Sequence, residues 1–268
     1  MSRAERRKPP ASAPATGAAG LAARLRKARL PGTPMGLAER ARKALLAYVE
    51  SAAAHGMPAA EIAARLADGR AAETVARVER QEAAARGKDP AEGAACAAGC
   101  AFCCILAGAD GGTITAHEAR RLHAALAPLA GTPDGRDWHP RACPALDPQT
   151  RMCRAYDARP TLCRSYHSTD AAACEANVHG AAQEGARLAG AHLTYLAAHG
   201  LARAALAGQA PVETFALYDV AAGAVSGASL EDTLAVARHP PEALDAERRR
   251  TGKALRSGPR RAARPRRA

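Results

Sequence analysis

Aromatic side chains are scarce in this sequence. Its 268 residues include five Tyr, two Phe and one Trp, so aromatics make up 3% of the chain, while alanine and leucine are frequent. The core of a sheet-based protein is normally rich in aromatic and β-branched residues, whereas helices pack closely through small side chains. The composition therefore argues against a sheet-based fold and predicts a mainly α-helical one.

Long apolar runs are also missing. No stretch reaches the roughly 20 apolar residues that a membrane helix needs. The basic residues near the N-terminus are followed by Pro, Ala and Ser rather than by the apolar segment of a secretory signal. We therefore expect a cytoplasmic protein with no membrane span. Because thiols stay reduced in the cytoplasm, the eight cysteines are expected to bind metal or to take part in redox chemistry.

Positive charge is concentrated at the two ends of the chain. Residues 1–30 contain eight Lys or Arg and one Glu, and residues 248–268 contain ten Lys or Arg and no acid. Since the whole chain carries +12, residues 31–247 carry a net −5. We predict a disordered basic arm over 1–34 and a disordered basic tail over 247–268. Both ends are candidates to bind nucleic acid or an acidic partner, although neither contains an aromatic residue to stack on bases.

Helical periodicity marks the segment between these ends. One helix is expected from Leu37 to His55. A second helical stretch begins at Pro58, ends near residue 84 and is expected to break near Gly69. Residues 115 and 118 are a Thr and a Glu at the spacing of a capping box, which predicts a helix over 115–129.

Turn residues organise the rest of the chain. Residues 130–141 read as a loop, and the run Asp147-Pro148-Gln149-Thr150 predicts the turn of a short β-hairpin over 142–156. Further helical segments are expected over 171–209, 213–222 and 230–238. The predicted organisation is a single helical domain over 35–246 that contains the cysteine cluster, with residues 92–178 as its central segment.

The first cysteine group has the pattern C-x3-C-x2-C-C and consists of Cys96, Cys100, Cys103 and Cys104. On a helix these positions would share one side, and in a tight loop they would equally converge. Both arrangements bring several thiolates within reach of one ion, and soft thiolates in a tetrahedral array suit zinc and iron. The alternative is an apolar stripe, because reduced cysteine is also a small buried hydrophobe.

The second group consists of Cys143, Cys153, Cys163 and Cys174, spaced ten, ten and eleven residues apart. Arg154 and Arg164 each directly follow a cysteine. A neighbouring guanidinium lowers the pKa of a thiol and would balance the negative charge of a thiolate-rich site. The alternative is that both arginines are ordinary surface charges.

These segments resemble the YkgJ-type cysteine-cluster family, which is described as chelating zinc or iron. The resemblance lies in residues 96–104 (CAAGCAFCC), in the Thr and Glu of the capping box, and in residues 143–146 (CPAL), 153–156 (CRAY) and 159–164 (RPTLCR). It covers under a third of the chain and includes all eight cysteines. The first gap here has three residues, whereas many members have two. The resemblance implies metal binding and says little about a reaction.

The sequence therefore predicts a mainly α fold, a single helical domain with a small β-hairpin around a cysteine-held metal centre. Its ligands would be Cys96, Cys100, Cys103, Cys104, Cys143, Cys153, Cys163 and Cys174, and His139 and His167 are candidates to replace a thiolate. The ion is zinc or iron, and iron would be held as an iron–sulfur cluster or as a mononuclear thiolate site.

Three functions remain open at this point, and the catalytic residues, if there are any, are unknown. The first is a metal-binding protein for metal handling or electron transfer. The second is a cluster-dependent redox or protein-modification enzyme, which would need an open coordination position and a pocket beside it. The third is a nucleic-acid-binding protein with structural zinc, which would use the basic ends.

Overall fold

The computed structural model describes residues 17–89, 91–105, 111–180, 186–188 and 190–257. Over these residues the chain is mainly helical, with two small antiparallel sheets of two strands each. Buried apolar side chains form two hydrophobic clusters, one among the N-terminal helices and one beside the cysteine-rich loops. The predicted mainly α fold is therefore confirmed.

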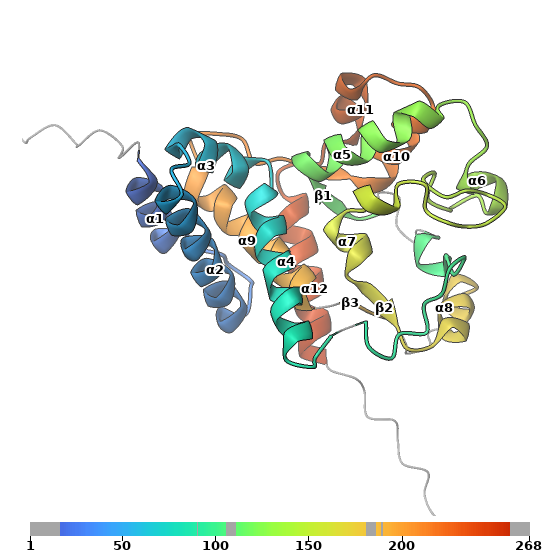
Figure 1. Cartoon of the computed structure of the whole chain (residues 1–268), viewed down its shortest axis with the longest axis horizontal. Coiled ribbons are helices and arrows are strands. Elements are labelled where there is room, and N and C mark those ends of the chain that lie inside the picture. Colours follow the sequence, from blue (N-terminus) through green and yellow to red (C-terminus); the bar gives the residue numbers. More distant parts are fainter. Residues whose placement is uncertain (1–16, 90, 106–110, 181–185, 189, 258–268) are drawn as a thin grey trace, which may run out of the picture.

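The first core is built by α1 (Ala18–Lys27), α2 (Met35–Ala54), α3 (Ala59–Ala67), α4 (Arg70–Ala85), α9 (Gly190–Leu206) and α12 (Ala243–Ser257). Helix α9 is central and packs on each of the other five. Residues 191–202 of α9 are all buried, as expected for a helix surrounded by others. In Figure 1 this group of helices occupies one side of the molecule.

The second core surrounds two short strand–helix units. The first is β1 (Thr113–Thr115) followed by α5 (Ala116–Leu126), and the second is β4 (Thr214–Ala216) followed by α10 (Leu217–Val225). The two strands pair antiparallel with the buried Ile114 opposite the buried Phe215. Helix α10 packs on α5 and on α11 (Leu230–Ala237).

The cysteine-rich part of the chain is built from short elements. These are η1 (Phe102–Cys104), η2 (Ala127–Leu129), α6 (Gly135–Trp138), η3 (Tyr156–Ala158), α7 (Thr161–Arg164), β2 (Tyr166–Ser168), α8 (Ala171–Val178) and β3 (Ala186–Leu188). Strands β2 and β3 pair antiparallel, with Tyr166 opposite Leu188. Figure 1 shows these elements on the side of the molecule away from α1 and α2.

Several local predictions are confirmed. Helix α2 coincides with the segment expected from Leu37 to His55, and the following stretch divides into α3 and α4 at Gly69, whose φ is +96°. A Cβ at Gly69 would overlap the side chain of Thr115, so glycine is needed both for its conformation and for this close approach. The capping box of Thr115 and Glu118 forms at the start of α5.

Other local predictions need correction. The expected loop 130–141 contains the four-residue helix α6, which Asp134 caps through a hydrogen bond from the Arg136 N–H. The expected hairpin 142–156 has its turn at Asp147 but only one bridge, between Leu146 and Cys153. The reason is that Asp147 Oδ1 binds the N–H groups of residues 149 and 150, which favours a wide turn over extended strands. The segment 171–209 is also interrupted, by β3.

The expected disorder at the two ends is wrong for the described parts. Helix α1 lies within the predicted arm, and its Leu21 and Leu25 are buried in the first core. Helix α12 extends past residue 247, and its Arg248 is 4% exposed. The prediction rested on the number of basic residues and overlooked that Leu21 and Leu25 of the arm stand at helical spacing. Residues 1–16 and 258–268 lie outside the described residues.

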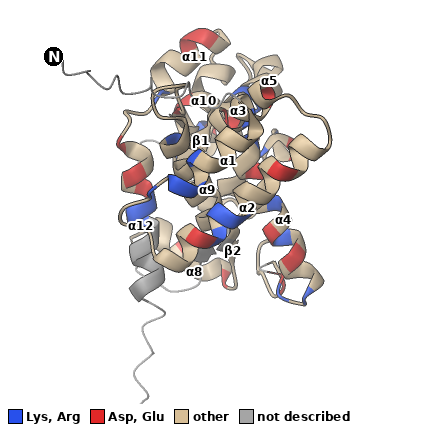
Figure 2. Ribbon diagram, turned by 90° about the vertical axis from the view of Figure 1, so that its left-hand side faces the viewer, with Lys and Arg blue, Asp and Glu red and all other residues tan. Residues whose placement is uncertain are grey.

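Helices α2 and α4 each carry charged residues of both signs. Figure 2 shows Lys or Arg and Asp or Glu interspersed on these two helices. No helix in the described part of the chain has both the length and the apolar character to cross a membrane.

Candidate metal centre

The first cysteine group lies in a loop rather than on a regular helix. Its start is held by the Ala95 N–H, which donates to the Ser168 carbonyl oxygen over 2.7 Å. A turn follows at Gly99, and residues 102–104 form the single 3-10 turn η1. The loop then joins the second cysteine group, because the Cys143 N–H donates to the Cys104 carbonyl oxygen over 2.8 Å.

Cys143 and Cys153 are placed by the turn at Asp147. Cys153 bridges to Leu146, and the Arg154 N–H donates to the Ala145 carbonyl oxygen over 2.8 Å. The turn rests on α6 through Gly135, where a Cβ would overlap the Cys143 carbonyl oxygen. A larger residue at position 135 would therefore displace the backbone that carries Cys143.

Cys163 and Cys174 come from two short helices. Cys163 is the third residue of α7, and Cys174 is the fourth residue of α8. Asp170 caps α8 by accepting a hydrogen bond from the Ala173 N–H over 3.0 Å. Helix α8 packs on η1 and so flanks the loop that carries the first cysteine group.

Five thiols lie close enough to influence one another's charge, and we call them the inner group: Cys103, Cys104, Cys143, Cys153 and Cys163. The hydrogen bond with Cys103 raises the pKa of Cys104 most, followed by burial and by negative charge on Cys103, Cys143 and Cys163. Burial first, and then charge on Cys143, Cys153 and Cys103, raises the pKa of Cys163. The inner group therefore combines residues from both sequence groups.

The remaining cysteines form an outer group of Cys96, Cys100 and Cys174. Cys96 is exposed, and its Sγ lies 3.9 Å from the Ser168 carbonyl oxygen. Burial raises the pKa of Cys100, with smaller contributions from charge on Cys96 and Cys103. Burial likewise raises the pKa of Tyr166, and charge on Cys174, Cys103 and Cys96 adds to that effect. Cys103 thus lies between the two groups.

The thiols are gathered but not yet arranged around one point. No three Cys, His, Asp or Glu side chains among the described residues converge closely enough to hold an ion. The Sγ atoms of Cys103 and Cys104 are 4.0 Å apart. This spacing is near the roughly 3.8 Å that separates two sulfurs across a tetrahedral zinc site with bonds of about 2.3 Å. The donor set of thiols fits zinc or iron, and binding would require the side chains to move toward a common point.

Burial keeps most inner thiols protonated in the absence of metal. It raises the pKa of Cys143 to about 12, because removal from water disfavours the thiolate. It also raises the pKa of Cys153. Cys103 is the exception: the hydrogen bond from Cys104 lowers its pKa. A metal ion would displace the protons, since thiolates are the metal-binding form.

Three arginines supply positive charge near these thiols. Arg159 is the first of them to lower the pKa of Cys153, ahead of Arg154 and Arg164, and it also lowers that of Cys103. Sequence analysis missed Arg159 because it does not follow a cysteine. Arg154 and Arg164 have a second role, because their guanidinium groups donate to backbone carbonyl oxygens of the surrounding loops.

A pocket of about 180 Å³ opens beside the cysteine loop. It is lined by Phe102, Ile105, Trp138, His139, Arg151, Glu175, Val178 and His179. Phe102 and Ile105 directly flank Cys103 and Cys104. The predicted alternative ligand His139 lies in this pocket, where its Nδ1 accepts a hydrogen bond from the Arg141 N–H. His167 lies in β2, and a ligand role for either histidine stays a prediction.

Sequence analysis also missed a buried carboxylate network behind α7. Glu118, found only as a helix cap, accepts hydrogen bonds from Tyr195 in α9 and from the Thr161 N–H in α7. The capping-box spacing was the only signal in the sequence, and it concerned a local contact. The long-range partners lie 77 and 43 residues away along the chain.

Comparison with known proteins gives one match. No curated protein and no solved structure matches the chain. The segment that matches a family model, residues 95–184, extends slightly beyond the stretch from Cys96 to Cys174 and contains all eight cysteines. This match confirms the resemblance predicted from the sequence. Residues 95–184 match the model of the CxxCxxCC family, described as a putative zinc- or iron-chelating domain.

Proposed function

We propose that this protein binds zinc or iron through thiolates of the inner group. The observation that carries the proposal is the gathering of Cys103, Cys104, Cys143, Cys153 and Cys163 from separate loops and a helix beside one buried core. An apolar stripe would not require this convergence, because alanine or leucine would fill a core equally well. The match to a zinc- or iron-chelating family supports the same assignment.

For the role of the metal we propose metal handling or electron transfer. Cys96 of the outer group and Cys103 of the inner group are exposed, and the other inner thiols are half-buried or buried. This arrangement gives an ion a path from solvent through soft ligands into the site. Arg159, Arg154 and Arg164 favour thiolate charge at Cys153 and suit an iron–sulfur cluster as well as zinc.

The experiment is anaerobic purification without added metal, followed by metal analysis, acid-labile sulfide analysis and an absorption spectrum. We expect at least one tightly held metal per chain. Iron with sulfide and a coloured, air-sensitive protein would identify a cluster, whereas colourless protein with stoichiometric zinc would identify a zinc site. A folded protein without metal, and with no affinity for added Zn²⁺ or Fe²⁺, would overturn the proposal.

The ligand assignment has a matched pair of variants. Cys163→Ser removes an inner thiol and Cys174→Ser an outer one, each by exchange of sulfur for oxygen in a short helix. We expect Cys163→Ser to lower metal content and thermal stability more, because ligand binding energy is also folding energy. Equal metal content in the two variants would contradict the division into inner and outer groups.

The pocket favours an enzyme as the second candidate function. A catalytic metal site needs space for a substrate, and the pocket lies beside the residues that flank Cys103 and Cys104. Trp138, the one tryptophan of the chain, lines it and provides a probe. A small molecule that alters Trp138 fluorescence and also perturbs the spectrum of bound Co²⁺ would support this candidate. Fluorescence changes with an unchanged Co²⁺ spectrum would count against it.

A further inference from the structure

Glu118 is fully buried and has four hydrogen-bond donors. Its Oε2 accepts from the Thr115 N–H over 3.1 Å, from Thr115 Oγ1 over 3.3 Å and from the Tyr195 hydroxyl over 2.5 Å. Its Oε1 accepts from the Thr161 N–H over 2.6 Å. Three of these contacts are made to Oε2 and one to Oε1, so both oxygens of the carboxylate accept hydrogen bonds. Glu118 thereby joins α5, α9 and α7.

The contact with Thr161 fixes the helix that carries Cys163. The first N–H groups of a helix have no partner within it, and α7 begins after Pro160, which offers no side-chain cap. Glu118 supplies the missing acceptor from another helix. Since Thr161 lies two residues before Cys163, this hydrogen bond sets the position from which the Cys163 thiol extends.

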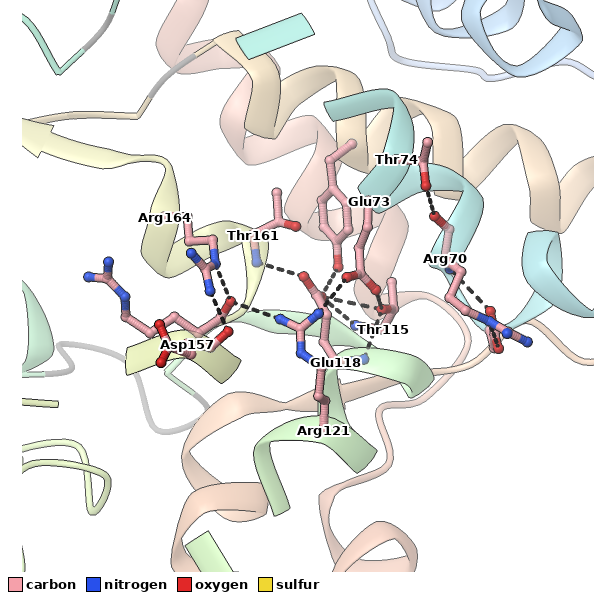
Figure 3. A network of polar contacts seen from close by, with 12 residues as sticks. Arg70, Glu73, Thr74, Thr115, Glu118, Arg121, Asp157, Thr161 and Arg164 are labelled. Atoms are coloured by element: carbon pink, nitrogen blue, oxygen red, sulfur yellow. Dashed lines mark hydrogen bonds and ion pairs between the residues drawn. The ribbon is translucent and has the colours of Figure 1, made fainter. Parts of the chain in front are cut away.

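A second side chain of α5 supports the same segment. Arg121, one turn after Glu118, donates from Nη2 to the Arg159 carbonyl oxygen over 3.3 Å and lies 3.5 Å from the Glu73 carboxylate of α4. Arg164 also binds this segment, because its Nε donates to the Arg159 carbonyl oxygen over 2.8 Å. Figure 3 shows Glu118 and Arg121 directed from α5 toward Thr161 and the neighbouring loop.

We infer that Glu118 is a positioning residue for the metal ligand Cys163, and that it links the metal centre to the helical layer around α9. The inference rests on the proposed function for the identity of the ligand. On the helical side the link runs through the Tyr195 hydroxyl, and on the metal side through the Thr161 N–H. Neither contact involves the metal itself, so Glu118 acts through α7.

The test compares Glu118→Gln with the matched control Leu201→Ala. Gln has nearly the same shape, but its amide has one acceptor oxygen, so it cannot serve both the Thr115 and the Thr161 N–H groups. Leu201 is fully buried in α9 and belongs to the first core, so Leu201→Ala destabilises that core without removing a hydrogen bond to Glu118. Tyr195→Phe removes a single donor from Glu118 and serves as a milder variant if Glu118→Gln fails to fold.

Two measurements are made on the full chain. The first is Zn²⁺ affinity by competition with a chromophoric chelator. We expect Glu118→Gln to bind Zn²⁺ about tenfold more weakly than wild type, because losing a residue that holds a metal ligand in place typically weakens metal binding by about that factor. The second needs no metal: alkylation of each thiol in metal-free protein, followed by mass spectrometry. We expect Cys163 to react faster in Glu118→Gln while Cys174 keeps its wild-type rate. Tyr195→Phe should change both quantities in the same direction by less.

The control separates positioning from general stability. Leu201→Ala should lower thermal stability but leave the Zn²⁺ affinity and the Cys163-to-Cys174 rate ratio as in wild type. If Glu118→Gln behaves like Leu201→Ala in both measurements, the positioning role is wrong. If wild type binds no Zn²⁺, the proposed function fails at that metal, and the thiol rate ratio still decides whether Glu118 holds α7 in place.

Discussion

Arg248 connects the C-terminal helix α12 to the segment after α1. Replacing Arg248 should therefore lower the free energy of unfolding. Its guanidinium donates to the Pro31 carbonyl oxygen over 3.0 Å, to Thr33 Oγ1 and to Asp245 Oδ1 over 2.6 Å, and its side chain is 4% exposed. Removing one partner of a buried charged network costs about 3–5 kcal/mol. Asp245 retains Arg203 at 2.8 Å, so we expect Arg248→Ala to cost about 3 kcal/mol, at the low end of that range.

The assay is equilibrium unfolding in urea, with thermal melting as a second measure. For a chain of this size 1 kcal/mol corresponds to about 2–4 °C, so the melting temperature should fall by about 6–12 °C. The control is Arg250→Ala in the same helix, because the Arg250 side chain is 75% exposed where it pairs with Glu247. Arg250→Ala should change stability by less than about 0.5 kcal/mol. Equal unfolding midpoints for the two variants would refute the reasoning.

Two further predictions concern the cores. Gly69→Ala should destabilise the protein by more than about 2 kcal/mol in thermal unfolding, because position 69 combines a φ of +96° with a Cβ that would overlap Thr115. The control Gly56→Ala, at a φ of +80° with open space around the Cβ, should cost about 1 kcal/mol. A larger loss of stability in Gly56→Ala than in Gly69→Ala would contradict this. Burial lowers the pKa of His192 and of His199 to about 4. Between that value and about 6.5 the unfolded chain binds more protons than the folded one, so stability should fall by up to about 3 kcal/mol per histidine as the pH is lowered through this window. Urea unfolding at pH 7 and 4.5 tests this, and a His199→Gln variant with an undiminished pH dependence would argue against His199.

Local signals in the sequence predicted the secondary-structure elements well. Contacts between distant segments could not be predicted. The capping box at Thr115 and the break at Gly69 follow from interactions within a few residues, so they could be predicted. The same glycine also packs against Thr115, and the same cap carboxylate binds Tyr195, but no pattern in a single sequence reports which distant segments meet. For that reason Glu118 was found as a cap and missed as a link.

The candidate site was predictable as a set of residues but not as an arrangement. Cysteine spacing and the family resemblance named all eight thiols, while the division into an inner and an outer group depends on loop packing. Arg159 was missed as a counter-charge because it does not directly follow a cysteine, although it lowers the pKa of both Cys153 and Cys103. Disorder was predicted at the N-terminal end from its basic composition. Leu21 and Leu25 in that segment instead form part of the first core.

The pairing of β1 with β4 has a consequence for synthesis on the ribosome. The partners Ile114 and Phe215 are about a hundred residues apart, and α1–α4 likewise need the later α9 to complete their core. Because a nascent chain emerges from its N-terminus onward, all eight cysteines leave the ribosome before either core can close. Each thiol is therefore accessible to solvent for the time needed to translate the segment up to β4. Metal present during that interval would meet an open cluster, whereas metal added to finished protein must enter a partly buried one.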